Sequence, residues 1–340
     1  MSISILFTCA GRRNYLIHYF RDVLGKNGQI YAADTNPDAP AMQEVDRAFV
    51  VPSIYNQSYI SSLLSICSEY KVNILIPLND LELPVLANVR ADFSEAGTIA
   101  LVSSTEVINT CFDKLETCQF SIDNGIHFPL TFYSIADAIK GLNDGILKFP
   151  LVVKPRWGTA SIGIEICHDL EELKLAYRLI QKRLPKTILS NISSNDIGKS
   201  VLIQEFLHGQ EYGLDIVNDL NGRYVCTFVK KKLGMRAGET DKAITVELEE
   251  LSKTGALIGT ALRHTGNLDC DLFITGKGIY LLEMNPRFGG GYPFSHVAGA
   301  NIPAAIIAWV MGKTPDSSWF KITPGVTSAK CDRLVVRTVQ

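Results

Sequence analysis

The chain has 340 residues, of which 46% are apolar and 20% are charged, and this balance excludes a disordered or collagen-like protein. The 33 Lys and Arg residues nearly balance the 35 Asp and Glu residues, so there is no basic excess of the kind that general nucleic-acid binding needs. We expect no membrane span, because the most apolar stretch after the N-terminus, residues 302–311, is far shorter than the ~20 residues required.

The N-terminus and the cysteines indicate the cellular location. The first apolar run has no basic segment before it and no Ala-x-Ala site after it, so we do not expect a signal peptide. The eight cysteines are scattered and form no CxxC pair, which argues against a zinc site or a disulfide framework. We therefore expect reduced core thiols in a cytoplasmic protein.

Strands and helices alternate over the first hundred residues. This alternation predicts a parallel sheet with helices on both faces. The predicted strands are residues 3–8, 30–33, 48–51, 72–77 and 98–102, and the predicted helices are residues 12–24, 59–70 and 81–96.

Strands become more frequent after residue 200. Before that point we predict one helix over residues 105–124, running through Lys114, a long helix over 169–184 and a polar loop over 186–199. The predicted strands are 149–154, 163–167, 201–206, 211–218, 224–230, 270–274 and 279–285, and one further helix is predicted at 251–264.

The segment from Thr8 to Arg13 imitates the start of a dinucleotide-binding domain, with Asp34 at the end of the second strand. It has one glycine, Gly11, in place of the GxGxxG triplet, so NAD binding is disfavoured. The favoured interpretation is a doubly wound sheet whose strand ends form one wall of a cleft. The polar residues at these strand ends are Arg12, Arg13, Asn79, Asp80 and Glu82.

Carboxylates gather in a predicted hairpin near the C-terminus. If the connection is the three residues 276–278, Asp271 lies directly opposite Glu283, and Asn285 shares the face of Glu283. Two carboxylates and an amide oxygen are ligands that suit Mg²⁺, which commonly shares its shell with phosphates. Arg287 follows at once and offers a fork for phosphate oxygens. A merely solvated hairpin fits poorly, because the intervening residues are apolar.

Two more segments suggest nucleotide binding less strongly. Lys154 ends an apolar strand and precedes a loop of small residues, which can fold its N–H groups over phosphates. An ordinary strand–turn–strand explains that segment about as well. A backbone hinge after another buried strand could read an adenine edge, with Glu211 beyond it for ribose hydroxyls, although this segment judged alone is just a strand pair. The small loop residues are Gly158, Ser161 and Gly163, and the hinge residues are Gln204, Glu205, Phe206 and Leu207.

Together and in this order, the three segments resemble the ATP-grasp superfamily, and most closely the stand-alone proteins similar to the carbamoyl-phosphate synthase large subunit. The segments 285–293 and 9–13 are typical of that group, and the resemblance covers residues 3 to about 312. It implies an α/β protein in which a doubly wound parallel-sheet domain, residues 1–104, precedes an α+β ATP-grasp domain, residues 105–320. In that domain a lid subdomain (about 145–206) and a C-terminal subdomain (about 207–320) would clasp ATP, and residues 321–340 would form a tail.

The resemblance also implies a role for each matching residue. Lys114 would bind phosphate, Lys154 would contact the α-phosphate and the base, and Arg287 would lie near the transferred phosphoryl or acyl group. The lid is less glycine-rich than in many members, so the amides that touch phosphate are not assigned. The implied positions are the phosphate lid 158–163 with Gly158, Ser161 and Gly163, the adenine hinge Gln204, Glu205, Phe206 and Leu207, the ribose ligand Glu211, and the Mg²⁺ (alternatively Mn²⁺) ligands Asp271, Glu283 and Asn285.

The run from Lys230 to Lys232, together with Arg236, is the local basic cluster. A solvated strand end and contact with phosphates or an acidic substrate are equally open interpretations. In the second interpretation Lys230 and Arg236 join Arg287 and Asn285 as catalytic candidates, and residues 234–242 form a mobile loop that closes over substrate.

The favoured function is an ATP-dependent ligase that phosphorylates a small carboxylate and joins it to an amine. Two alternatives stay open: carbamoyl-phosphate-type phosphorylation of carbamate or bicarbonate, and a non-catalytic nucleotide- or NAD-binding module. The complete metal set argues against the latter, since binding alone does not need it. The sequence identifies neither substrate, and it leaves open whether the chain forms a homodimer.

Overall fold

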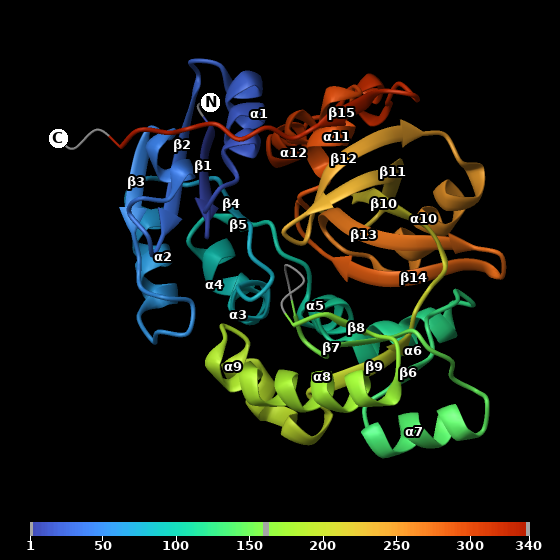
Figure 1. The fold of residues 1–340 in the computed structure, drawn as a ribbon. Coiled ribbons are helices and arrows are strands. Elements are labelled where there is room, and N and C mark those ends of the chain that lie inside the picture. The colour runs from blue at the N-terminus through green and yellow to red at the C-terminus, as the bar shows by residue number, and fades with distance from the viewer. Residues whose placement is uncertain (1–2, 159–162, 338–340) are drawn as a thin grey trace.

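The computed structural model describes residues 3–158 and 163–337, which form three β-sheets (Figure 1). The N-terminal sheet is parallel and has the order β3-β2-β1-β4-β5, so its topology reverses between β1 and β4. This confirms the doubly wound sheet expected from the alternating pattern. Its strands are β1 (Ile3–Thr8), β2 (Gly28–Asp34), β3 (Arg47–Val50), β4 (Ile74–Pro77) and β5 (Ile99–Ala100), and its helices are α1 (Asn14–Leu24), α2 (Tyr59–Glu69), α3 (Leu83–Asn88) and α4 (Arg90–Glu95).

Alternate residues of β1 supply two apolar cores, one on each face of this sheet. Ile5 and Phe7 pack against α1, whereas Leu6 faces α2, α3 and α4. The first core continues into the C-terminal part of the chain, where Phe288 and Tyr292 join it. The rings of Phe20 and Phe288 lie 6.1 Å apart, edge to face. The N-terminal sheet and the C-terminal helices α11 (Tyr292–Val297) and α12 (Ile302–Val310) therefore share one core.

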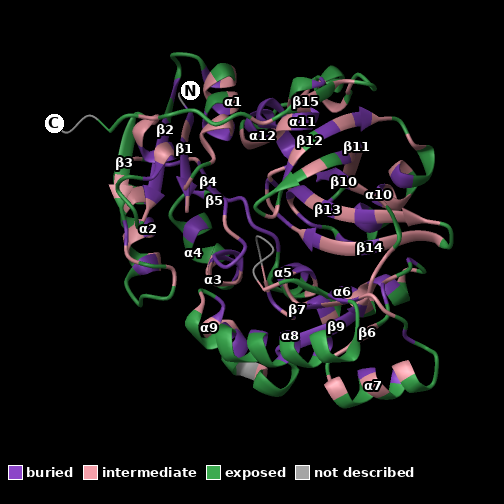
Figure 2. Cartoon of the chain, in the orientation of Figure 1, coloured by how far each residue is buried: buried purple, intermediate pink, exposed green. Residues whose placement is uncertain are grey.

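An antiparallel sheet of order β6-β9-β7-β8 forms the lower part of the molecule in Figure 1, and α8 runs beneath it. It forms most of its own core, to which Leu173 and Ile203 belong, and Leu81 from the N-terminal domain joins that core. Figure 2 shows the outer face of α8 exposed to solvent. The elements are β6 (Thr131–Phe132), α7 (Ile135–Asn143), β7 (Leu151–Pro155), β8 (Glu165–Cys167), α8 (Leu170–Arg183) and β9 (Val201–Glu205).

The third sheet is antiparallel and has the order β14-β13-β10-β11-β12-β15. One face of this sheet packs on α10 (Glu249–Leu262) and on α5 (Thr105–Phe112). After β15 the chain, residues 330–337, runs back toward the N-terminal sheet, where Arg333 pairs with Glu44 and Arg337 pairs with Asp38 (Figure 1). The strands are β10 (Gly209–Asn218), β11 (Tyr224–Arg236), β12 (Glu239–Val246), β13 (Gly266–Thr275), β14 (Gly278–Asn285) and β15 (Thr327–Ala329).

Several predicted elements were wrong in detail. The helix predicted over 105–124 is interrupted at Asp113, whose extended backbone (φ −96°, ψ 113°) and capping side chain start a new helix, α6 (Lys114–Asp123). The predicted helix 81–96 is likewise divided, into α3 and α4. The predicted mobile loop 234–242 is instead the paired hairpin of β11 and β12. The predicted loop 186–199 contains short helical segments, at Leu184–Lys186, Ser190–Ser193 and Ser194–Lys199.

None of the helices in the described ranges is long and apolar enough to cross a membrane.

Candidate active site

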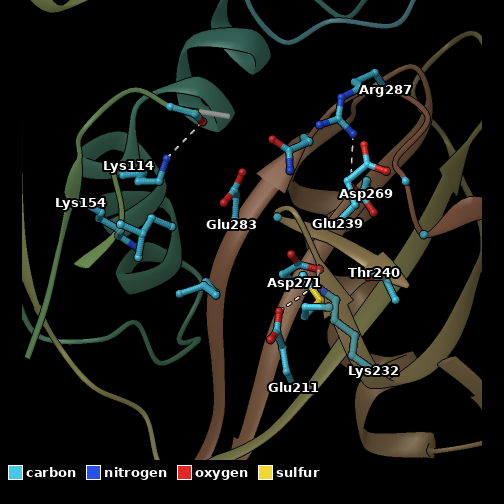
Figure 3. A pocket seen from close by; sticks show the side chains of 18 of the residues that line it. Lys114, Lys154, Glu211, Lys232, Glu239, Thr240, Asp269, Asp271, Glu283 and Arg287 are labelled. Atoms are coloured by element: carbon cyan, nitrogen blue, oxygen red, sulfur yellow. Dashed lines mark hydrogen bonds and ion pairs between the residues drawn. The ribbon is translucent and has the colours of Figure 1, made fainter. Parts of the chain in front are cut away.

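A cavity of about 290 Å³ lies where the three sheets meet. Side chains reach it from the β13–β14 hairpin, from the end of β7 and from the start of α6 (Figure 3). The turn after β1 also contributes a side chain to the lining. The lining includes charged, amide and glycine residues: Arg13, Lys114, Lys154, Gly158, Glu211, Lys232, Glu239, Asp269, Asp271, Glu283, Asn285, Arg287, Gly290 and Gly291.

A β-bulge sets the register of the carboxylates. The turn of the hairpin is two residues long, not three as predicted, because Thr275 pairs with Gly278. Leu282 is an extra residue in β14, and beyond it Asp271 pairs with Glu283 as the sequence analysis expected. If the regular pairing continued through Leu282, Glu283 would instead stand opposite Cys270, which is fully buried in the apolar core. The bulge therefore turns the Glu283 carboxylate out of the core and into the cavity.

The same register brings in a carboxylate that the sequence analysis missed. Asp269 pairs with Asn285 and lies on the face of Asp271, because the two aspartates are two residues apart on β13. Because side chains alternate between the two faces of a strand, the sequence could have revealed that Asp269 shares the face of Asp271.

Lys232 joins two carboxylates of the site. Its Nζ lies 2.7 Å from Glu211 Oε1 and 2.7 Å from Asp271 Oδ1, and its side chain is 6% exposed. Burial opposes its charge, but the two carboxylates raise the pKa of Lys232. Burial also raises the pKa of Asp271, an effect that Lys232 opposes and that Asp269 reinforces. The crowded carboxylates thus favour a cation at this wall of the cavity.

The opposite wall carries two lysines, as Figure 3 shows on the far side of Glu283. Lys114 and Lys154 are both buried, and the Lys114 Nζ lies 3.5 Å from the carbonyl oxygen of Gly158. Among the described residues, neither lysine has a carboxylate within ion-pair distance. Burial and the Lys114 charge lower the pKa of Lys154 from its usual 10.5 to about 7, although Glu283 acts in the opposite sense. Two cations without carboxylate partners face a carboxylate wall.

Arg287 connects this site to the N-terminal sheet. Its Nη2 donates to Asp80 Oδ2 at 2.8 Å, and its Nη1 donates to Asp269 Oδ2 at 3.2 Å. Arg13, from the turn after β1, also lines the cavity and lies 3.6 Å from Glu239 Oε1. Both Arg13 and Asp80 are strand-end residues that the sequence analysis placed in a cleft wall.

The glycines after Arg287 lie against charged side chains. A Cβ on Gly289 would come within 2.0 Å of Asp269 Cγ, and one on Gly291 within 2.7 Å of Lys230 Cε. One on Gly290 would meet Glu239 Oε2 at 2.9 Å. Glycine is needed here for close approach of the backbone to these side chains.

The two remaining catalytic candidates lie outside the cavity lining. Lys230 is 1% exposed, and its Nζ donates to Asp215 Oδ2 at 2.5 Å inside the third sheet. Arg236 is half-exposed and pairs with Asp241 at 3.0 Å and with Asp332 at 2.6 Å. Lys230 and Lys232 share a face of β11, but Asp215 engages Lys230, and Lys232 is the residue of the basic run that lines the cavity.

The predicted hinge also lies beyond the lining residues. Gln204 donates to Thr131 Oγ1 at 2.8 Å, and Glu205 accepts from the Leu130 N–H at 2.9 Å. Phe206 and Leu207 follow in the connection from β9 to β10, which joins two of the sheets. Of the lid residues, Gly158 lines the cavity, Gly163 (φ +71°) packs beside Pro155, and Ser161 lies outside the described residues.

The donor set is suited to a hard cation. Asp271, Glu283 and Asn285 offer carboxylate and amide oxygen atoms on one face of the hairpin, and oxygen ligands suit Mg²⁺. Within residues 3–158 and 163–337, no three His, Cys, Asp or Glu side chains are gathered closely enough to hold a metal by themselves. Asn285 and phosphate oxygens would have to complete the coordination, which fits a metal that arrives with a nucleotide.

Comparison with known proteins gives two family matches. Residues 5–101 match the family described as PylC-like, N-terminal domain, and residues 198–332 match ATP-grasp in the biosynthetic pathway with Ter operon. The carbamoyl phosphate synthase large chain of Clostridium beijerinckii is 28% identical over 170 residues, which cover 46% of this chain and 14% of that protein. The D-alanine–D-alanine ligase of Pediococcus pentosaceus is 26% identical over 192 residues, which cover 51% of this chain and 45% of that protein. The matches thus span less than half the length of these relatives.

Solved structures show the same fold. The biotin carboxylase–β,γ-ATP complex of Campylobacter jejuni has a TM-score of 0.73 at 15% identity and covers 94% of this chain and 73% of that one. The L-amino acid ligase of Bacillus licheniformis has a TM-score of 0.73 at 16% identity, with 96% and 79% of the two chains covered. Together with the family matches, these likenesses confirm the resemblance drawn from the motifs. The chain therefore has the fold of ATP-grasp enzymes, with a match to the PylC-like N-terminal domain over residues 5–101 and to an ATP-grasp family over residues 198–332.

Proposed function

We propose that this protein is an ATP-dependent ligase that converts a small carboxylate into an acyl phosphate and joins it to an amine, with release of ADP and phosphate. The observation that carries the proposal is the pair of opposed walls of the cavity. Lys114 and Lys154 lack carboxylate partners among the described residues, and they face Asp271 and Glu283. A polyphosphate with a divalent cation complements both walls, because its oxygens suit the lysines and its cation suits the carboxylates.

The residues of this chain then have the following tasks. Lys114 and Lys154 hold phosphate oxygens by charge-assisted hydrogen bonds. Asp271, Glu283 and Asn285 would hold Mg²⁺ or Mn²⁺, which when bound neutralises phosphate charge. Phosphoryl transfer depends mainly on alignment and charge stabilisation, so no nucleophile from the protein is needed.

Other assignments follow from the family resemblance. Glu211, which lines the cavity, is proposed to bind the ribose hydroxyls, and the connection at residues 204–207 is proposed to contact adenine. Arg287, next to Asn285 in the lining, is proposed to hold the carboxylate or acyl phosphate. We place the reaction in the cytoplasm, in keeping with eight cysteines that are free thiols in the described structure.

The test is a screen for ADP release over small carboxylates, including amino acids, each paired with amines, with mass spectrometry of the products. We expect ADP, phosphate and an amide. ADP with carbamoyl phosphate would replace the proposal by carbamoyl-phosphate chemistry, and AMP with pyrophosphate would refute it. Asp271→Asn should abolish the signal. The control Glu249→Gln changes a carboxylate that is 82% exposed on α10 and should leave the signal unchanged.

A further inference from the structure

Arg156 makes a dense set of polar contacts just outside the cavity. Its Nε lies 2.7 and 3.0 Å from the two carboxylate oxygens of Asp113, and its Nη2 lies 2.6 Å from one of them. Its Nη1 donates to Asp196 at 3.0 Å, and the guanidinium lies 4.4 Å from the ring centroid of Trp157. The Arg156 and Asp113 side chains are each only 13% exposed. This is a bidentate pair, which fixes orientation as well as distance.

The Arg156–Asp113 pair lies next in sequence to both lysines of the cavity. Asp113 is the N-cap of α6, since its side chain accepts from the Leu115 N–H at 3.0 Å, and Lys114 is the first residue of that helix. Arg156 follows β7, two residues after Lys154, and its own N–H donates to the Ser200 carbonyl at 2.9 Å. The pair therefore connects the start of the helix that carries Lys114 to the end of the strand that carries Lys154.

These two lysines repel each other, as the effect of Lys114 on the pKa of Lys154 shows. Neither has a carboxylate partner among the described residues to hold it in place. Lys114 Nζ reaches the Gly158 carbonyl at only 3.5 Å, so the short Arg156–Asp113 contacts supply the stronger attraction between the two elements. Neither member of the pair lines the cavity, so neither is placed to contact the nucleotide itself.

We propose that Arg156 is a positioning residue that, through Asp113, holds Lys114 and Lys154 at the spacing that lets both bind one phosphate chain. The proposal rests on the proposed function, because it takes the phosphates of ATP as the ligand of the two lysines. The proposal concerns phosphate binding alone, so loss of the pair should leave the affinity for the nucleoside part of ATP unchanged.

The test uses Arg156→Lys, which keeps the charge and removes the fork, and Asp113→Asn, which keeps a helix cap and weakens the pair. Calorimetry measures binding of a non-hydrolysable ATP analogue and of adenosine to each variant and to the double variant. Arg21→Lys is the control, because Arg21 also pairs with a carboxylate, that of Asp46, and neither of these two residues lines the cavity.

We expect each single variant to bind the ATP analogue about tenfold more weakly, or about 1.4 kcal/mol. The double variant should lose little more, because both changes break one contact. Adenosine binding, the KM values of the carboxylate and the amine, and the control should change less than twofold.

Unchanged analogue binding in both single variants would overturn the proposal, as would an equal loss of adenosine and analogue binding, which would make the pair merely structural. If the unaltered protein binds no ATP analogue, the proposed function fails together with this inference. If it does bind the analogue, a failure in the variants overturns this inference alone.

Discussion

Replacing Lys154 by methionine should stabilise the protein and weaken nucleotide binding at the same time. The lysine is 5% exposed, and its pKa is lowered from 10.5 to about 7. Each tenfold change in proton affinity is worth about 1.4 kcal/mol, so burial, together with the Lys114 charge, disfavours the charged lysine by about 5 kcal/mol. Below pH 7 the lysine is charged in both the folded and the unfolded chain, and this whole penalty lowers the free energy of unfolding. Between pH 7 and 10.5 only the unfolded chain keeps the proton, so the penalty shrinks as pH rises.

Urea unfolding without nucleotide should therefore show that Lys154→Met gains about 5 kcal/mol at pH 6 and about 2 kcal/mol at pH 9. The same variant should bind an ATP analogue roughly tenfold to hundredfold more weakly, since one charge-assisted contact of about 1.5–3 kcal/mol is lost. Lys253→Met is the control, because the Lys253 side chain on α10 is 75% exposed. A variant that is less stable than the unaltered protein, or whose gain is independent of pH, would refute the reasoning about burial. Unweakened analogue binding would remove Lys154 from the phosphate site.

Further changes probe the carboxylate hairpin and the glycines. Glu283→Gln should lower turnover at saturating Mg²⁺ by about 10²-fold or more while the free energy of unfolding changes little, and near-normal turnover would remove Glu283 from the metal site. Gly289→Ala should raise the KM of the carboxylate substrate, because its Cβ would lie 2.0 Å from Asp269 Cγ and displace the Arg287–Asp269 pair. Gly290→Ala should have a smaller effect on that KM, because its Cβ would meet the movable tip of Glu239 at 2.9 Å; equal effects would contradict the distinction.

Patterns that depend on neighbouring residues predicted much of the fold. Alternating strand and helix segments were sufficient for the doubly wound sheet, since each β–α unit is local in sequence. The Asp271–Glu283 pairing was also predicted, but through a three-residue turn that does not exist. The structure reaches that pairing through a two-residue turn and the extra residue Leu282, and no local signal marks such a bulge.

Contacts between segments that lie far apart in the chain could not be predicted from the sequence. Arg287 and Asp80 are 207 residues apart, so their ion pair follows from the packing of the C-terminal part of the chain on the N-terminal sheet. Lys232 was one residue in a basic run, and only its position between Glu211 and Asp271 distinguishes it from Lys230. The break before Lys114 was signalled by Asp113, an N-cap residue that the apolar periodicity obscured.

The core that the N-terminal sheet shares with α11 and α12 has a mechanical consequence. Separating Phe20 from Phe288 would expose a large apolar surface to water, so these parts of the molecule move as one body. The sheet that carries Lys154 is built on a different core, most of which it forms itself and which Leu81 links to the N-terminal domain, so it is held to this body by fewer apolar contacts. Nucleotide binding is therefore expected to change the distance between Lys154 and Glu283, while the distance within the Asp80–Arg287 ion pair stays the same.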